Sequence, residues 1–199
     1  MKMSKTTSHT GHGGRNTPPL NGPGDMMQAE NDSLKQRVAE LEKLVVRDTL
    51  TPLYNRRYFM EELERLCVRA QRHDTQYGLI YIDVDGLKSI NDRYGHNAGD
   101  ELLITVAAAL QRRIRRFDIA ARMGGDEFAI LLDSVGAAMM DSKIAALRQQ
   151  VHDCALDFDG DLVKPCISVG YTMVDPQLDA SKILAQADAD MYRQKRQKS

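Results

Sequence analysis

The sequence predicts an α/β sandwich in which helices cover a mainly antiparallel sheet. Short apolar runs typical of strands alternate with longer segments whose apolar residues recur at helical spacing. Two of the strand-like runs meet at Gly124 and Gly125, which indicates a β-hairpin. A chain of 199 residues is long enough for one domain and an appendage, whereas two full domains are not expected.

Residues 1–25 are rich in Gly, Pro, Ser, Thr and Asn and contain almost no large apolar side chain. Such a segment cannot bury enough apolar surface to offset the entropy lost on ordering, so we expect a disordered tail. No run of the sequence approaches the roughly 18 apolar residues that span a membrane. The sequence therefore predicts no membrane contact and a cytoplasmic location.

A heptad pattern occupies residues 26–47. Its apolar and amide positions, alternately four and three residues apart, are Met27, Asn31, Leu34, Val38, Leu41 and Val45. Val at a positions, Leu at d positions and one Asn at an a position are typical of a parallel two-stranded coiled coil. The segment predicts a homodimer, and the alternative is a single amphipathic helix that lies on its own domain.

The later elements are predicted in chain order from their patterns. A helix should begin near Asn55, because Phe59, Leu63 and Leu66 follow at helical spacing. The remaining expectations are a buried strand over 77–84, a short helix over 87–93, a turn at 95–100, a helical face from Leu102 to Ile114, strands over 118–123 and 127–133, a helix over 137–154, a strand over 165–174 and a helix from Ala180 to the end.

The composition excludes some classes of protein. With 27 basic and 28 acidic side chains the net charge is −1, so no overall field attracts nucleic acid, and an anionic ligand needs a local cluster. Three cysteines, Cys67, Cys154 and Cys166, are widely spaced and odd in number. We expect reduced thiols that serve as small core residues, as in a cytosolic protein.

The segment RMGGDEFAILLD at 122–133 places two adjacent carboxylates, Asp126 and Glu127, in the predicted hairpin. A primed turn needs positive φ at both central residues, which explains the glycines but not two acids that repel each other. A further acid, Asp83, stands where the strand 77–84 ends. If the strands are neighbours, these carboxylates converge, and their oxygen atoms select Mg²⁺ or Mn²⁺. Ordinary turn acids are the alternative.

The segment after Asp83 favours a nucleotide. A magnesium ion in such a site usually completes its shell with phosphate oxygens and water, and Lys88 adds a compact positive charge. Asn91 and Asp100 form a candidate base-reading pair. A carboxylate accepts two parallel donors, which guanine offers and adenine lacks, while an amide can donate to a ring acceptor. The alternatives are a turn residue at Asn91 and a helix N-cap at Asp100.

Five segments in order carry a resemblance to a known family. They are DTLTPLYNRRYF at 48–59, DVDGLKSINDRYGHNAGD at 83–100, RMGGDEFAILL at 122–132, SVG at 168–170 and ADADMYRQK at 187–195. Over residues 48–199 the chain resembles the diguanylate cyclase, or GGDEF, family, although Pro52 and Leu87 replace the usual glycine and phenylalanine. The resemblance implies a palm-like sheet, similar to that of nucleotide cyclases, and the condensation of two GTP molecules into cyclic di-GMP with release of pyrophosphate.

The resemblance also implies the catalytic residues. Asp83, the backbone carbonyl of Val84 and Asp126 would hold the metal ions. Asp126, or a hydroxide held by the metal beside it, would help deprotonate the ribose 3′-hydroxyl. Glu127 would support the metal site, and Lys88 would face phosphate or the transition state.

The substrate-binding residues follow from the same resemblance. Asn91 and Asp100 would read guanine, and Lys195 would meet the distal phosphates. His96 would lie at the substrate pocket, although it could equally be a structural turn residue. Gly124 and Gly125 would remove side chains where the nucleotide lies against the hairpin.

The family's product-binding inhibitory site has a counterpart here. Arg115 and Asp118 form an Arg-x-x-Asp sequence just before the hairpin. A guanidinium suits the recognition of phosphate and guanine, and the alternative is a solvated basic helix end. The resemblance therefore implies a cyclase that is inhibited by cyclic di-GMP.

Each domain of this kind would hold one GTP, so two domains must face each other, and a parallel coil over 26–47 would bring them together. One alternative is a non-catalytic module that senses GTP or cyclic di-GMP, although such sensors tend to lose Asp126 or Glu127. A second is an interaction protein whose coil is the functional part. Nucleic-acid binding through Arg112 and the arginines that follow it is weakly supported, because no aromatic platform accompanies them.

Overall fold

The structure is a computed structural model that describes residues 26–28, 30–35, 37, 46–72 and 75–198. The chain divides into two units, residues 1–41 and 42–199. The described residues between 26 and 37 are helical, and Met27 and Leu34 are exposed. The tail predicted over 1–25 and the later heptad positions Val38, Leu41 and Val45 lie outside the described residues. The coiled coil and the homodimer therefore stay predictions.

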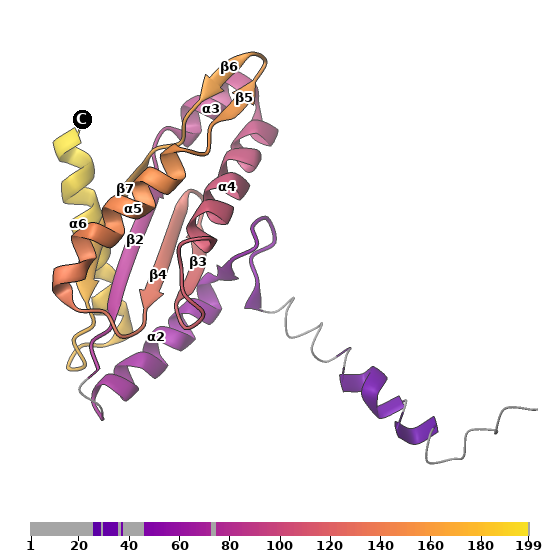
Figure 1. Cartoon of the computed structure of the whole chain (residues 1–199), viewed down its shortest axis with the longest axis vertical. Coiled ribbons are helices and arrows are strands. Elements are labelled where there is room, and N and C mark those ends of the chain that lie inside the picture. Colours follow the sequence, from indigo (N-terminus) through magenta and orange to yellow (C-terminus); the bar gives the residue numbers. More distant parts are fainter. Residues whose placement is uncertain (1–25, 29, 36, 38–45, 73–74, 199) are drawn as a thin grey trace, which may run out of the picture. The chain divides into compact units, whose positions relative to one another are not determined.

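The second unit is built around a five-stranded sheet of order β1-β3-β4-β2-β7 (Figure 1). Only β1 and β3 run parallel among its neighbouring pairs, so the predicted mainly antiparallel sheet is confirmed. The strands are β1 (Tyr54–Asn55), β2 (Gly78–Val84), β3 (Ile119–Gly124), β4 (Glu127–Leu132) and β7 (Ile167–Met173). A separate hairpin consists of β5 (Leu156–Phe158) and β6 (Asp161–Val163).

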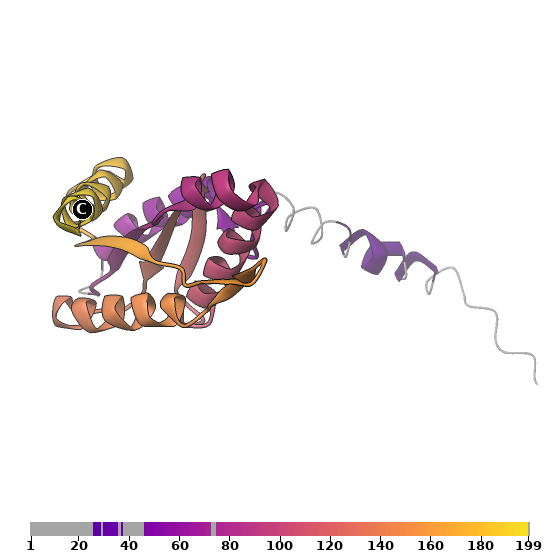
Figure 2. The same cartoon turned by 90° about the horizontal axis from the view of Figure 1, so that it is seen from above.

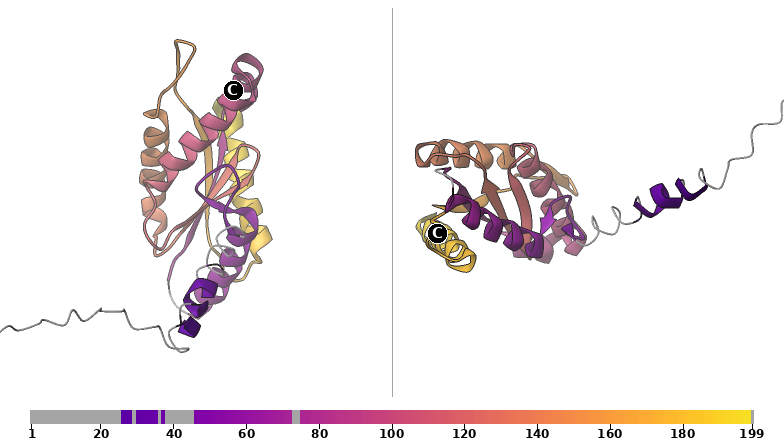
Figure 3. Two further views of the ribbon diagram at one scale, coloured as in Figure 1. Left: turned by 90° about the vertical axis from the view of Figure 1, so that its right-hand side faces the viewer. Right: turned by 90° about the horizontal axis from the view of Figure 1, so that it is seen from below.

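Helices cover both faces of the sheet, as predicted. They are α2 (Arg56–Ala70), α3 (Leu87–Tyr94), α4 (His96–Gln111), the 3₁₀ turn η1 (Ala137–Met139), α5 (Met140–His152) and α6 (Ala180–Lys198). The view from above in Figure 2 shows α5 and α6 on opposite sides of the sheet. The view from below in Figure 3 shows α2 on the same side as α6.

Strand β2 lies between β4 and β7 and contributes to two hydrophobic cores. Ile80 and Ile82 pack on the face that α4 and α5 cover, and Leu79 and Tyr81 pack on the face that α2 and α6 cover. Because side chains alternate along a strand, Asp83 follows Leu79 and Tyr81 on the second face. A continuous apolar run buried on both faces therefore ends in a carboxylate beneath α6.

The predicted turn at 95–100 is wrong, because α4 begins at His96. Gly95 is the residue before this helix and has a φ of 87°. Asp100 lies inside the first turns of α4 and is not its N-cap, which removes one alternative for that residue. Helix α4 also ends at Gln111, so Ile114 lies beyond it.

Three short strands were not predicted. β1 has two residues, and β5 and β6 have three each, which is too short for alternation of apolar and polar residues to be recognised. The helix start near Asn55 is confirmed, because its side chain accepts a hydrogen bond from the Tyr58 amide at 3.0 Å and caps α2.

The cysteines are all free, as expected, but only Cys67 is a buried core residue, and Cys166 is exposed. The helices within the described ranges include none with the length and apolar content to cross a membrane.

Candidate active site

Three polar residues lie in register where β2 ends. Asp83 is directly opposite Glu127 on β4 and Ser168 on β7. Residues opposite each other in an antiparallel pair point to the same face of the sheet. Two carboxylates and a buried hydroxyl therefore share the face that α2 and α6 cover, and the Ser168 hydroxyl donates to Asp85 at 2.7 Å.

The hairpin between β3 and β4 brings Asp126 to the same place. The Val84 amide donates to the Asp126 carbonyl oxygen at 3.0 Å, which ties the hairpin tip to the end of β2. The predicted convergence of Asp83, Val84, Asp126 and Glu127 is thus present. We call the side chains of Asp83, Asp126 and Glu127 the acid cluster.

The turn of this hairpin differs from the prediction by one residue. Gly124 pairs with Glu127 as the last residue of β3, so Gly125 and Asp126 are the two central residues. Gly125 has a φ of 48°, which favours glycine, while Asp126 is not among the residues with positive φ. A Cβ built on either glycine meets no protein atom within 4 Å, so contacts within the chain do not require a missing side chain.

Lys195 of α6 lies on the acid cluster. Its Nζ donates to Asp83 Oδ1 at 2.5 Å, and the Asp83 side chain is only 13% exposed. Burial raises the pKa of the Asp83 carboxyl, the Lys195 hydrogen bond opposes this rise, and the charges of Asp126 and Asp85 add to it. The hydrogen bond to Asp83 in turn raises the pKa of Lys195. The cluster therefore attracts a positive charge.

The acid cluster fits a hard divalent cation. Its donors are carboxylate oxygens with the Val84 backbone beside them, and oxygen ligands of this kind suit Mg²⁺ and Mn²⁺. The ammonium of Lys195 stands on Asp83 in the place of such a cation. Across the described ranges, no three His, Cys, Asp or Glu side chains are already arranged around one point.

Tyr81 is a residue of the site that the sequence interpretation missed. It is 4% exposed, and its hydroxyl is hydrogen bonded to Glu127. Burial and the negative charge of Glu127 raise the pKa of Tyr81, so the phenol stays protonated and donates to the carboxylate. The sequence could have indicated this role, because Tyr81 stands two residues before Asp83 on β2 and therefore shares its face of the sheet.

A hollow of about 400 Å³ lies beside Glu127. It is lined by Arg56, Met60, Tyr81, Glu127, Ser181, Leu184, Ala185 and Asp188. These residues come from α2, β2, β4 and α6, so the hollow is part of the face that carries the acid cluster.

Arg122 binds the backbone of the hairpin turn. Its guanidinium donates twice to the Gly125 carbonyl oxygen, at 2.7 and 3.0 Å, and contacts Asp48 Oδ1 at 3.4 Å. The same Asp48 oxygen accepts from the Thr51 amide and hydroxyl, both at 2.8 Å. The segment before β1 is thereby linked to the turn that carries Asp126. Neither role was assigned from the sequence.

The predicted base-reading residues lie on α3 and α4. Asn91 is partly buried, and its Oδ1 atom is buried without a hydrogen-bond partner in the described part of the chain. Asp100 is exposed, as are His96 at the start of α4 and Lys88 in the first turn of α3. Their contact with a base or phosphate stays a prediction.

The predicted inhibitory pair has one buried and one exposed member. Asp118 is 7% exposed, and its carboxylate accepts from the Arg115 amide at 2.8 Å and from the Asp133 amide at 3.1 Å. Asp118 therefore also shapes the loop before β3. The Arg115 side chain is exposed, and it lines a hollow of about 230 Å³ together with Arg113 and Lys143.

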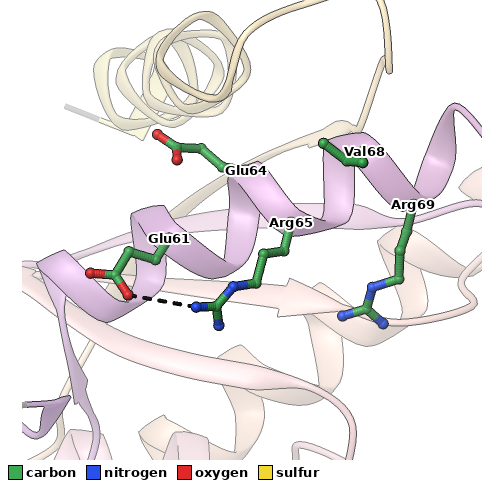
Figure 4. A pocket seen from close by; sticks show the side chains of 5 residues that line it. All are labelled: Glu61, Glu64, Arg65, Val68 and Arg69. Carbon is green, nitrogen blue, oxygen red and sulfur yellow. Dashed lines mark ion pairs between the residues drawn. The ribbon is translucent and has the colours of Figure 1, made fainter.

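A hollow of about 530 Å³ lies on the outer side of α2. Its lining residues all belong to that helix. Figure 4 shows Glu64 and Val68 along one edge of the helix and Glu61, Arg65 and Arg69 along the other, with an ion pair between Glu61 and Arg65. They do not converge on one point, and none belongs to the acid cluster. This surface is therefore not the candidate active site.

The chain is similar to known proteins of one family. Residues 45–199 match the family described as "Diguanylate cyclase, GGDEF domain". The chain is 35% identical over 168 residues to the diguanylate cyclase DgcP of Escherichia coli, and 33% identical over 179 residues to the diguanylate cyclase TpbB of Pseudomonas aeruginosa. These matches cover 84% and 87% of this chain but only 49% and 40% of the two relatives.

Solved structures show the same fold. The coiled coil and GGDEF domain of DgcB from Caulobacter crescentus, in complex with c-di-GMP, matches with a TM-score of 0.80 and 29% identity, covering 85% of this chain and 91% of that one. The diguanylate cyclase SiaD of Pseudomonas aeruginosa, in complex with its activator SiaC, has a TM-score of 0.77 and 30% identity, covering 87% and 67%. The chain therefore belongs to the GGDEF domain family of diguanylate cyclases.

Proposed function

We propose that this protein condenses two GTP molecules into cyclic di-GMP and releases two pyrophosphates. In each half of the reaction a ribose 3′-oxygen of one GTP bonds to the α-phosphorus of the other. The bond from that phosphorus to the bridging oxygen breaks, and pyrophosphate leaves. The observation that carries the proposal is the acid cluster, where Asp83 and Glu127 stand in register and the Val84 amide ties Asp126 beside them.

The acid cluster would hold Mg²⁺ or Mn²⁺ through Asp83, Asp126 and the Val84 carbonyl, and Glu127 would support them. The bound cation would stabilise the charge that develops on the attacking oxygen and on the α-phosphate. Lys195 would then turn from Asp83 toward the distal phosphates, because a cation on Asp83 repels its ammonium. Lys88, exposed at the start of α3, would add a second positive charge to the phosphate side.

Proton transfer would fall to the hairpin. Asp126 lies at the turn, where its carboxylate can accept the proton of the 3′-hydroxyl. Tyr81 would keep Glu127 oriented, because a buried phenol that donates to a carboxylate restricts its rotation. Arg122 would fix the turn itself through the Gly125 carbonyl oxygen.

Base recognition would come from α3 and α4. The Asp100 carboxylate would accept the two parallel donors of guanine, and Asn91, with His96 nearby, would complete the contact. Helices α3 and α4 pack against each other, and Asp100 is exposed, which supports the assignment of both residues to one base.

A dimer follows from the symmetry of the product. Two domains, each with one GTP, must face each other, and a parallel coil over 26–47 would supply this arrangement. Product inhibition would use the hollow beside Asp118, where Arg113, Arg115 and Lys143 offer positive charge to the two phosphates of cyclic di-GMP.

The direct test is incubation of the purified chain with GTP and Mg²⁺, followed by chromatography of the nucleotides. Asp126→Ala runs in parallel, with Asp141→Ala, which removes an exposed acid in the first turn of α5, as the matched control. We expect cyclic di-GMP from the native chain and from Asp141→Ala but not from Asp126→Ala. Absence of product from the native chain, with GTP or cyclic di-GMP still bound, would instead identify a sensing module.

A further inference from the structure

Helix α4 passes unusually close to the side chain of Asn91. A Cβ built on Gly99 would lie 1.9 Å from Asn91 Oδ1 and 2.9 Å from its Cγ, whereas real Cβ atoms almost never come within 3.0 Å of another heavy atom. The Leu87 side chain stands 3.2 Å from the same position. The carboxamide of Asn91 therefore occupies the space that a side chain at position 99 would fill.

The backbone at Gly99 gives no other reason for a glycine. The residue is buried within α4, and it is not among the glycines with positive φ. Glycine in the interior of a helix is less favourable than alanine, because it loses more conformational freedom on folding. The close approach of Asn91 is thus the feature that requires a residue without a side chain.

Within the described residues, no hydrogen bond to its oxygen explains the position of this carboxamide either. Its oxygen is buried and lacks a partner in the described part of the chain, which is an unfavourable state for an acceptor. The shape of the surface formed by Gly99 and Leu87 therefore sets where the amide lies. Asp100 follows Gly99 in the chain, so the amide lies beside the turn of α4 that presents the Asp100 carboxylate.

We propose that Gly99 is a positioning residue for base specificity, which acts by letting the Asn91 carboxamide lie against α4 next to Asp100. The proposal rests on the proposed function, because it assigns Asn91 and Asp100 to guanine. A methyl group at position 99 displaces the amide from the base without touching the acid cluster. Selectivity for guanine should fall, while contacts to phosphate and metal should remain.

The test compares Gly99→Ala with the native chain by calorimetric titration. The ligands are the α,β-methylene analogues of GTP and ATP, which cannot release pyrophosphate, and inorganic tripolyphosphate, all with Mg²⁺. We expect Gly99→Ala to bind the GTP analogue about tenfold more weakly, to lose most of its preference over the ATP analogue, and to bind tripolyphosphate normally. Gly136→Ala is the matched control, because a Cβ there meets only Gln76 at 3.6 Å.

A double-mutant cycle with Asn91→Ala separates positioning from a general effect on the helix. If Gly99 acts through Asn91, Gly99→Ala causes no further loss of GTP-analogue affinity once Asn91 is alanine. Removing the carboxamide also removes the overlap with Asn91, and alanine is more favourable than glycine inside a helix, so the double variant should unfold at a temperature no lower than that of Asn91→Ala. This result shows that the overlap with Asn91 causes any instability of Gly99→Ala alone.

Retained guanine preference in Gly99→Ala, or losses that simply multiply in the double variant, would overturn the assignment. If the native chain and Gly99→Ala discriminate equally between the two analogues, only the role of Gly99 is refuted, and the proposed function stands. A native chain that binds neither analogue refutes the proposed function, and the assignment of Gly99 fails with it.

Discussion

The acid cluster and the base-reading residues differ in how the chain holds them. At the end of β2, Asp83 is hydrogen bonded to Lys195, and Glu127 is hydrogen bonded to Tyr81. The backbone carbonyl oxygen of Asp126 accepts a hydrogen bond from the Val84 amide. On α3 and α4, the Asn91 oxygen has no partner within the described residues, and Asp100 is exposed. Strand register and charge position the acid cluster, whereas the packing of α3 against α4 positions the base-reading residues.

This difference separates two kinds of effect. Substitutions in the acid cluster should alter cation affinity and the stability of the fold, because its groups are partly buried and interact with one another. Substitution of Asn91 or Asp100 should alter mainly nucleotide affinity, because the Asn91 oxygen has no partner among the described residues and Asp100 is exposed.

Asp83→Asn should have the largest effect and should affect activity and stability in opposite directions. Loss of a metal-binding carboxylate should lower the rate of cyclic di-GMP formation at least about 100-fold. The folded-state pKa of Asp83 is raised, so this carboxyl contributes stability at low pH and loses that contribution as pH rises through the folded value. At pH 7 the variant should therefore resist urea at least as well as the native chain.

The urea midpoint and the rate of product formation check both halves of this prediction. Asp141→Asn serves as the control, because it removes the charge of an exposed acid on α5. A variant of Asp83 that unfolds at clearly lower urea concentration would mean that the ion pair with Lys195 outweighs burial and repulsion.

Asp100→Asn should weaken nucleotide binding without touching the cation site. The carboxylate can accept two donors from guanine, whereas the amide can accept at only one of its two polar atoms. We expect about a tenfold to 100-fold loss of affinity for the GTP analogue, since one hydrogen bond to a charged group is lost, with unchanged Mn²⁺ affinity. Glu101→Gln, at the next exposed position, is the control. An equal loss of Mn²⁺ affinity would show that the two regions are not separate.

Lys195→Met should bind Mg²⁺ more tightly when no nucleotide is present. The ammonium on Asp83 competes with an added cation. Because the Lys195 side chain is 40% exposed, its ion pair with Asp83 contributes up to about 1 kcal/mol of free energy. We expect roughly a threefold to fivefold gain in Mg²⁺ affinity, together with weaker binding of tripolyphosphate. Calorimetry measures both. Lys182→Met, which removes an exposed lysine paired with Asp179, should change neither value.

Asp48→Asn should have a smaller effect, confined to stability and dependent on pH. Burial alone would raise the pKa of Asp48, but hydrogen bonds from Thr51 and the charge of Arg122 outweigh it and lower the pKa. A carboxyl of this kind stabilises the fold above its unfolded pKa of about 3.9 and loses the contribution as pH falls through the folded value.

We therefore expect Asp48→Asn to lose about 1 kcal/mol of unfolding free energy at pH 7, and the difference to shrink below about pH 4. Urea titrations at pH 7 and pH 3 measure it. A difference that is the same at both pH values would show that the charge of Asp48 does not contribute to stability.

Much of this arrangement follows from local patterns. The apolar run of β2, its terminal Asp83 and the acids of the hairpin were recognisable because alternation and turn chemistry act over a few residues. The contact between Lys195 and Asp83 joins residues 112 apart, so no local pattern could reveal it. The start of α4 was hidden because Gly95 and Gly99 resemble turn residues, although Gly99 instead makes room for Asn91.

We expect the acid cluster to hold the divalent cation. Paramagnetic broadening of backbone amide signals by Mn²⁺, in the presence of the α,β-methylene GTP analogue, tests this most directly. We expect broadening centred on Asp83 to Asp85 and Gly125 to Glu127, and we expect Asp83→Asn to lose it. Broadening centred instead on the acidic β5–β6 hairpin, or unchanged in Asp83→Asn, would contradict it.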